Sequence, residues 1–141
     1  MWLTRPKLDI AKLKQNKDIS GMIQALGHRD WLIRRDAARA LGELKDPEAM
    51  TSLSLCLLRD GYWLVRWSAA MALLQIGDRR ACSSLAFSMK RDPDRHVRLA
   101  AKDALLELEK MNRPNIVEPV GNLDEARPGM GQPAISEPVA G

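Results

Sequence analysis

Few residues of this chain have the types and spacing that catalysis or metal binding requires. Its 141 residues include two histidines, His28 and His96, and neither belongs to a His-Glu pair of the kind that binds iron. No cluster of carboxylates takes the place of such a pair. A metal site needs several converging ligands. Ser-His-Asp patterning and the phosphate-binding motifs GxGxxG and GxxxxGK[ST] are also missing from the sequence. We therefore expect no catalytic residue, no metal and no cofactor.

The two cysteines, Cys56 and Cys82, lack the CxxC spacing of metal and redox motifs. Both fall in helical apolar patterns, so we expect two small buried residues. Such free thiols suit a reducing compartment. No apolar run approaches the roughly 18 residues that span a bilayer, and the N-terminus does not resemble a signal peptide. A cytoplasmic protein is expected.

Three arginines, Arg34, Arg66 and Arg98, recur 32 residues apart. One interpretation is a ladder that binds anions. The favoured alternative is structural, with each arginine paired to an aspartate near a helix end. The candidate aspartates are Asp30, Asp60, Asp92 and Asp94.

The elements that must position these residues form an internal repeat. Segments 33–44, 65–76 and 97–108 align without gaps. Each has five apolar positions spaced i, i+4, i+7, i+8 and i+11, which make one stripe on an α-helix. In the first segment they are Ile33, Ala37, Ala40, Leu41 and Leu44.

A second helix is predicted before each of these, with Asp18, Asp46 and Asp78 as start signals. Asp30 and Asp94 have the positions of N-caps for the following helices, where the middle unit has Tyr62. The fold class is therefore all-α: a right-handed solenoid of about three helical hairpins in residues 18–110, with a short capping helix near residues 8–13.

The domain is expected to cover residues 1–111, with a Pro/Gly-rich disordered tail over 112–141. Residues 1–111 hold 20 of the 22 Lys and Arg and 14 of the 18 Asp and Glu, a net charge of +6. A basic domain can attract nucleic acid, anionic lipid or acidic protein, and charge alone does not choose among them.

Positions where the repeats differ are more informative about function. At 100° per residue, one face opposite the apolar stripe is polar in the first unit and apolar in the second. We expect a shallow concave groove there, rimmed by arginine, as in many protein interfaces. The alternative is that Trp63 and Trp67 pack between helices. The candidate residues are Arg35, Arg39, Trp63, Trp67, Met71, Leu99 and Asp103.

The repeated segments resemble the short HEAT-like repeats of the phycobilisome-lyase type. The resemblance rests on the segment from Asp30 to Asp46, which includes Ile33, Arg34 and Gly42. The later units match this segment. The resemblance covers roughly residues 8–110 and implies the solenoid fold. Relatives of this kind include scaffolds, bilin lyases, a di-iron hydroxylase that depends on His-Glu pairs, and DNA glycosylases for alkylated bases. The missing His-Glu pairs argue against the hydroxylase.

The leading functional hypothesis is a non-catalytic protein-binding scaffold or adaptor that docks a partner's helix or peptide in the groove. Nucleic-acid binding through the basic face is an alternative, and a bilin-lyase-like accessory role is another. A glycosylase needs a carboxylate in an aromatic cleft, and we expect Asp103 to lie one repeat away from the tryptophans. End-to-end association of the exposed solenoid ends is a further expectation.

Overall fold

The computed structural model describes residues 7–114, and the regular elements among them are all helical. The elements are α1 (Ile10–Gln15), α2 (Ile19–Ala25), α3 (Trp31–Leu44), η1 (Pro47–Ala49), α4 (Met50–Arg59), α5 (Trp63–Ile76), η2 (Arg79–Ala81), α6 (Cys82–Arg91) and α7 (Arg95–Met111), where η marks a 3-10 turn.

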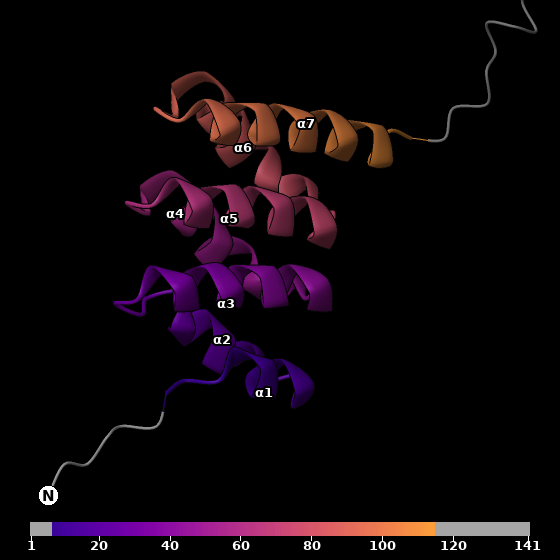
Figure 1. The fold of residues 1–141 in the computed structure, drawn as a ribbon. Helices are drawn as coiled ribbons and strands as arrows, with labels where there is room; N and C mark the ends of the chain where they lie inside the picture. The colour runs from indigo at the N-terminus through magenta and orange to yellow at the C-terminus, as the bar shows by residue number, and fades with distance from the viewer. Residues whose placement is uncertain (1–6, 115–141) are drawn as a thin grey trace, which may run out of the picture.

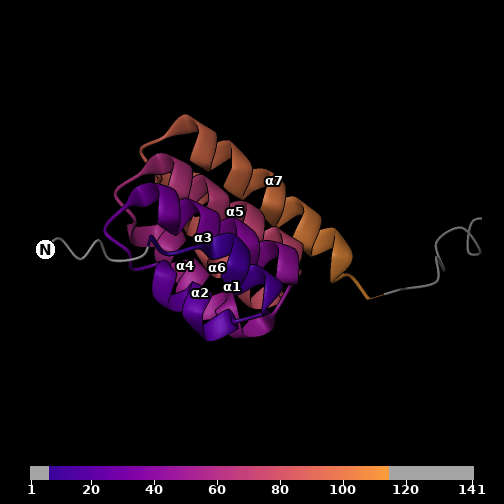
Figure 2. The same cartoon turned by 60° about the horizontal axis from the view of Figure 1, so that its bottom comes forward.

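Three helical hairpins, α2–α3, α4–α5 and α6–α7, stack one on the next (Figure 1). The second helices α3, α5 and α7 form one layer of nearly parallel helices, and α4 packs on α6 in the other layer. Figure 2 shows the two layers from the N-terminal end of the stack. The predicted all-α solenoid of hairpins is confirmed. Its right-handed sense stays a prediction.

Aspartates begin most of the helices, as predicted. The side chains of Asp18, Asp30 and Asp94 accept from backbone N–H groups in the first turns of α2, α3 and α7. Tyr62, which precedes α5, makes no such bond. Its own N–H donates instead to Asp60 Oδ1 at 2.9 Å, so an aspartate two residues earlier orders this loop.

The helices predicted to start after Asp46 and Asp78 begin differently. Each aspartate caps a 3-10 turn, η1 or η2, and the α-helix proper starts three residues later at Met50 or Cys82. The side chain of Asp46 accepts from Glu48 N at 2.9 Å, which fixes a tight turn before the α-helical hydrogen bonds begin.

The core contains the predicted apolar stripe and a second buried face that the stripe did not predict. Ala38 and Ala70 are fully buried, because α3 and α5 each have a neighbour on both sides. Gly42 of α3 lies close against α5, where an added Cβ would stand 2.7 Å from Ala72 Cα. In the last unit, Lys102 occupies the position that matches Ala38 and Ala70. Lys102 is exposed, and no described helix packs beyond α7.

The N-terminal end is covered by α1, which packs on α2 and α3 and buries Ile10. The predicted capping helix is therefore present, although it begins at Ile10 rather than near Leu8. Trp2 and Leu3, and the predicted tail beyond Pro114, lie outside the described residues. The last helix, α7, ends at Met111, and both the domain division at residue 111 and the disorder of the tail stay predictions.

Candidate protein-binding groove

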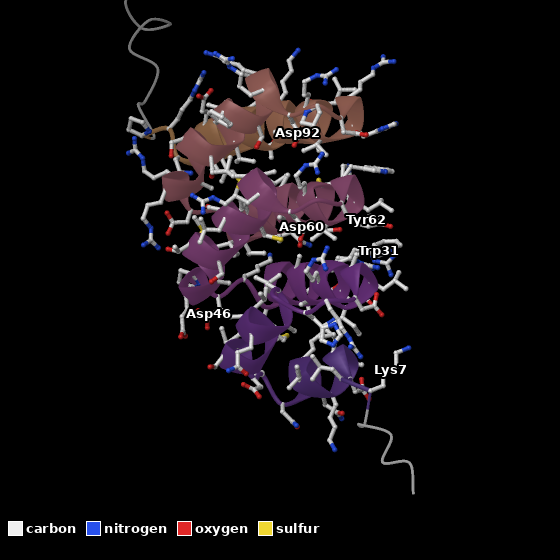
Figure 3. The ribbon with its side chains drawn as sticks, turned by 90° about the vertical axis from the view of Figure 1, so that its left-hand side faces the viewer. Lys7, Trp31, Asp46, Asp60, Tyr62 and Asp92 are labelled. Carbon is white, nitrogen blue, oxygen red and sulfur yellow. The ribbon has the colours of Figure 1, made fainter. Side chains whose placement is uncertain are left out.

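The recurring arginines join successive repeats. Arg34 on α3 donates from Nε and Nη2 to the two carboxylate oxygens of Asp60, at 2.7 and 3.1 Å. Arg66 on α5 does the same to Asp92, at 2.8 and 3.0 Å. Figure 3 shows Asp60 and Asp92 at successive levels of the stack. Because each aspartate belongs to the loop of the next hairpin, each pair fixes one repeat on another.

The same arginines also hold their own loops. Arg66 Nη1 donates to the carbonyl oxygen of Asp60 at 2.9 Å, and Arg34 Nη1 donates to that of His28 at 2.8 Å. The hydrogen bond from Arg66 to the Asp92 carboxylate raises the pKa of this guanidinium. These arginines are therefore occupied inside the fold, which supports the structural alternative over an anion-binding ladder.

Two details of that alternative need correction. Asp30 and Asp94 pair with no arginine of the described range and cap their own helices instead. Arg98 donates from Nη1 to the carbonyl oxygens of Asp92 and Pro93, at 2.8 and 3.0 Å, and meets no carboxylate within residues 7–114. The reason is positional, since no further repeat follows α7 in the described chain.

The candidate groove lies between α5 and α7. Trp67, Met71 and Leu74 of α5 and Leu99 of α7 line a cavity of about 380 Å³. Trp67 is 36% exposed and Leu99 is 47% exposed, while Met71 is half-buried against the core. The structure therefore brings together the apolar residues that differ among the repeats, and leaves much of their surface open.

The rim of this groove on α7 is acidic. Asp103 and Glu107 line the same cavity as Trp67. Asp103 lies one repeat after the tryptophans, as expected, and the stacking of α7 on α5 still brings it into one cavity lining with Met71, the residue at its equivalent position. Among residues 7–114, no arginine or lysine lines this cavity, so the predicted arginine rim is not part of it there.

Arg35 and Arg39 lie one helix away, beside a separate cavity of about 330 Å³ between α1 and α3. Arg35 pairs with Asp36 at 2.9 Å and lies over the ring of Trp31, 5.7 Å from its centroid. Arg39 is exposed and has no ion pair with any residue of the described range.

Trp63 lies outside the groove lining and stacks on His96 of the next repeat, with centroids 5.1 Å apart. Trp31 stacks on Tyr62 in a similar way at 4.7 Å, and Figure 3 shows this pair at the edge of the stack. The packing interpretation therefore describes Trp63 better than Trp67, although Trp63 keeps 38% of its surface exposed.

A second apolar surface was missed by the sequence argument. Phe87 of α6 is 58% exposed and lines a cavity of about 210 Å³ with Leu58 of α4. The Arg66–Asp92 pair lines the same cavity. Leu55 of α4 and Phe87 of α6 occupy equivalent positions that do not face the core. Two large apolar residues at one outward repeat position could have indicated this surface from the sequence.

The two cysteines differ in exposure, and Cys82 is only half-buried. Cys56 is buried, and burial first and the Asp60 charge second raise the pKa of its thiol to about 12. Over residues 7–114, no three His, Cys, Asp or Glu side chains are grouped as metal ligands would be. The same stretch contains no helix with the length and apolarity needed to cross a membrane.

The hairpins, their stacked layers and the arginine bonds between repeats define a short α-solenoid. Residues 19–106, more than half of the chain, match the family model of HEAT repeats, so the chain belongs to the HEAT-repeat family. A comparison with curated proteins finds no match. HEAT repeats are generally protein-interaction scaffolds and typically non-catalytic, and they commonly bind proteins.

Proposed function

We propose that this protein is a non-catalytic scaffold or adaptor that binds a partner protein in the groove between α5 and α7. The observation that carries the proposal is the open apolar surface of Trp67, Met71 and Leu99, drawn from two adjacent repeats. Trp and Met are enriched in the centres of protein interfaces. A Trp that loses its remaining exposure on binding is a typical hot spot.

Two further cavities, beside Phe87 and between α1 and α3, are weaker candidates. The cavity beside Phe87 contains the Arg66–Asp92 pair, whose hydrogen bonds already join two repeats. The cavity between α1 and α3 is lined largely by charged residues, of which Arg35 pairs with Asp36 and Lys14 with Glu43. Neither offers an apolar centre comparable to the groove.

The test is a pull-down with wild-type protein and with the double variant Trp67→Ala, Met71→Ala. Partner recovery should fall by roughly tenfold or more, because loss of a hot-spot Trp costs about 2 kcal/mol or more. Phe87→Ala, which removes an exposed aromatic from another surface, serves as the matched control. Equal recovery by the groove variant and wild type would sink the assignment.

Nucleic-acid binding remains the second candidate, because Asp103 and Trp67 line one cavity and a glycosylase needs a carboxylate in an aromatic cleft. The electrostatics of the groove oppose it, since Asp103 and Glu107 would repel phosphates. A salt titration of DNA affinity decides the matter. We expect weak binding even at low salt, and tight binding lost with Trp67→Ala would favour nucleic acid instead.

The proposed location is the cytoplasm. Cys56 and Cys82 are both free thiols, which is usual in a reducing compartment.

A further inference from the structure

The face that carries the groove has unmatched charges of opposite sign on its two sides. Arg39 on α3 and Asp103 on α7 occupy equivalent positions, one repeat before and one repeat after Met71 on α5. Both are exposed. Neither forms an ion pair within the range 7–114.

Their charged neighbours are already engaged. On the α3 side, Arg35 pairs with Asp36, and Lys14 pairs with Glu43. On the α7 side, Glu107 of the groove lining pairs with Lys110 at 2.9 Å. Arg39 on α3 and Asp103 on α7 are therefore unmatched charges on the two sides of the apolar centre at α5, and Arg95 at the start of α7 is a further exposed cation without an ion pair in this range.

The stacking sets the distance between the two charges. Because α3 packs on α5 and α5 packs on α7, two helix spacings separate Arg39 from Asp103. Spacings of 8–10 Å put the two charges roughly 16–20 Å apart. At 1.5 Å rise per residue, a bound helix covers that distance in about 11–13 residues.

We infer that the groove takes an amphipathic helix with opposite charges at its two ends. Its apolar stripe covers Trp67, Met71 and Leu99, a basic residue lies at Asp103, and an acidic residue lies about three turns away at Arg39. The inference rests on the proposed function and names the class of partner. A helix with the two charges exchanged would place like charges together at both rims.

The apolar residues of the groove do not lie midway between the two charges. The cavity lies between α5 and α7, so the basic end of the partner is close to the apolar stripe and the acidic end is farther from it. Exposed ion pairs contribute about 0.2–1 kcal/mol each, so each rim charge should change Kd by a factor of roughly 1.4 to 5. The apolar centre supplies most of the affinity, and the rim charges select among helices.

The probe is a displayed library of 18-residue helical peptides, selected on the full chain and counter-screened on the Trp67→Ala, Met71→Ala variant. We expect the Trp67-dependent binders to share an acidic and a basic residue about 11–13 positions apart, with apolar residues between them nearer to the basic end.

Charge-swapped proteins complete the test with a recovered peptide. Arg39→Glu and Asp103→Lys should each weaken binding by roughly two- to fivefold. The double variant should prefer the peptide whose acidic and basic residues are exchanged. Lys90→Glu, an exposed charge change on α6, is the matched control and should leave Kd unchanged.

The outcomes separate the inference from the proposed function. Binders that need Trp67 but show no charge order, or that ignore both swaps, overturn the charged-end helix and leave the groove assignment standing. A selection that yields no Trp67-dependent binder overturns the groove assignment and the inference with it.

Discussion

Gly42 lies where α3 and α5 come closest, and it shows how little space the stacked repeats leave. A Cβ at this position would stand 2.7 Å from Ala72 Cα and 2.3 Å from Gln75 Oε1. The glutamine side chain can move, whereas the backbone of α5 cannot do so without disturbing the layer. The absence of a side chain at residue 42 is therefore what allows the two repeats to pack.

Gly42→Ala is expected to lower the free energy of unfolding by about 1–3 kcal/mol, the usual cost of overpacking a dense core. Gly61→Ala is the matched control, because an added Cβ there meets nothing within 4 Å. Denaturant unfolding of the two variants gives both values. Equal stabilities would show that α3 and α5 are farther apart than the structure places them.

The thiol of Cys56 is expected to resist alkylation in the folded protein. Burial raises its pKa to about 12, so at pH 8 nearly all of it is protonated and unreactive. Iodoacetamide at pH 8 should label the half-buried Cys82 first, and Cys56 only after denaturation. Mass spectrometry of the labelled peptides measures the order, and rapid native labelling of Cys56 would contradict this packing.

Among the elements, the second helices α3, α5 and α7 have nearly identical apolar stripes, but the arginines near their N-terminal ends have different partners. Arg34 and Arg66 each reach an aspartate of the following repeat, whereas Arg98 reaches only backbone carbonyl groups in the described chain. Three residues of one type at one repeat position therefore have two different environments. Substituting these arginines one at a time separates the stability contributed by the ion pair between repeats from that of the hydrogen bonds to the helix's own loop.

Arg66→Ala should cost about 3 kcal/mol or more, because it leaves the buried Asp92 carboxylate without its partner. Arg98→Ala should cost about 1 kcal/mol, the contribution of ordinary hydrogen bonds. Thermal or denaturant unfolding of both variants tests the difference. Similar losses for Arg66 and Arg98 would argue against a specific role for the pairing between repeats.

The repeat period and the apolar stripe were sufficient to predict the hairpins, because both depend on local spacing along one helix. The second buried face at Ala38 and Gly42 was not predictable in the same way, since it depends on which helix lies on the other side. The Ala37-Ala38 and Ala69-Ala70 pairs, compared with Ala101-Lys102, contained that information.

The same limit applies to the groove. Sequence spacing placed Trp67, Met71, Leu99 and Asp103 on one face, but it did not show which of them line one cavity, because residues of different repeats are neighbours only after stacking. The Arg34–Asp60 and Arg66–Asp92 pairs required a partner 26 residues away in sequence, which no helical period specifies. Contacts across repeats were therefore the part that needed coordinates.

At the scale of the whole molecule, the two ends of the stack are not complementary. Arg98 is open at the C-terminal end, but the position that matches Asp60 and Asp92 in the first hairpin is His28. Lys102 also replaces the buried alanine of the inner repeats. Head-to-tail stacking of two copies would therefore bring basic side chains to His28 instead of to an aspartate.

We therefore expect a monomer at micromolar concentration, and not the end-to-end association considered from the sequence. Sedimentation velocity over a concentration series measures the state directly. His28→Asp, which supplies the missing carboxylate, should favour association if the ladder can join two copies. A wild-type dimer whose stability falls with Arg98→Ala would contradict the expectation.

The central claim is that the groove between α5 and α7 is the surface that meets a partner protein. Site-specific photo-crosslinking in cells tests it most directly, with the photoreactive amino acid placed at Met71 or, for comparison, at Phe87 on the other cavity. We predict a discrete protein adduct from position 71 that disappears with Trp67→Ala, and none from position 87. Adducts from position 87 alone would contradict it.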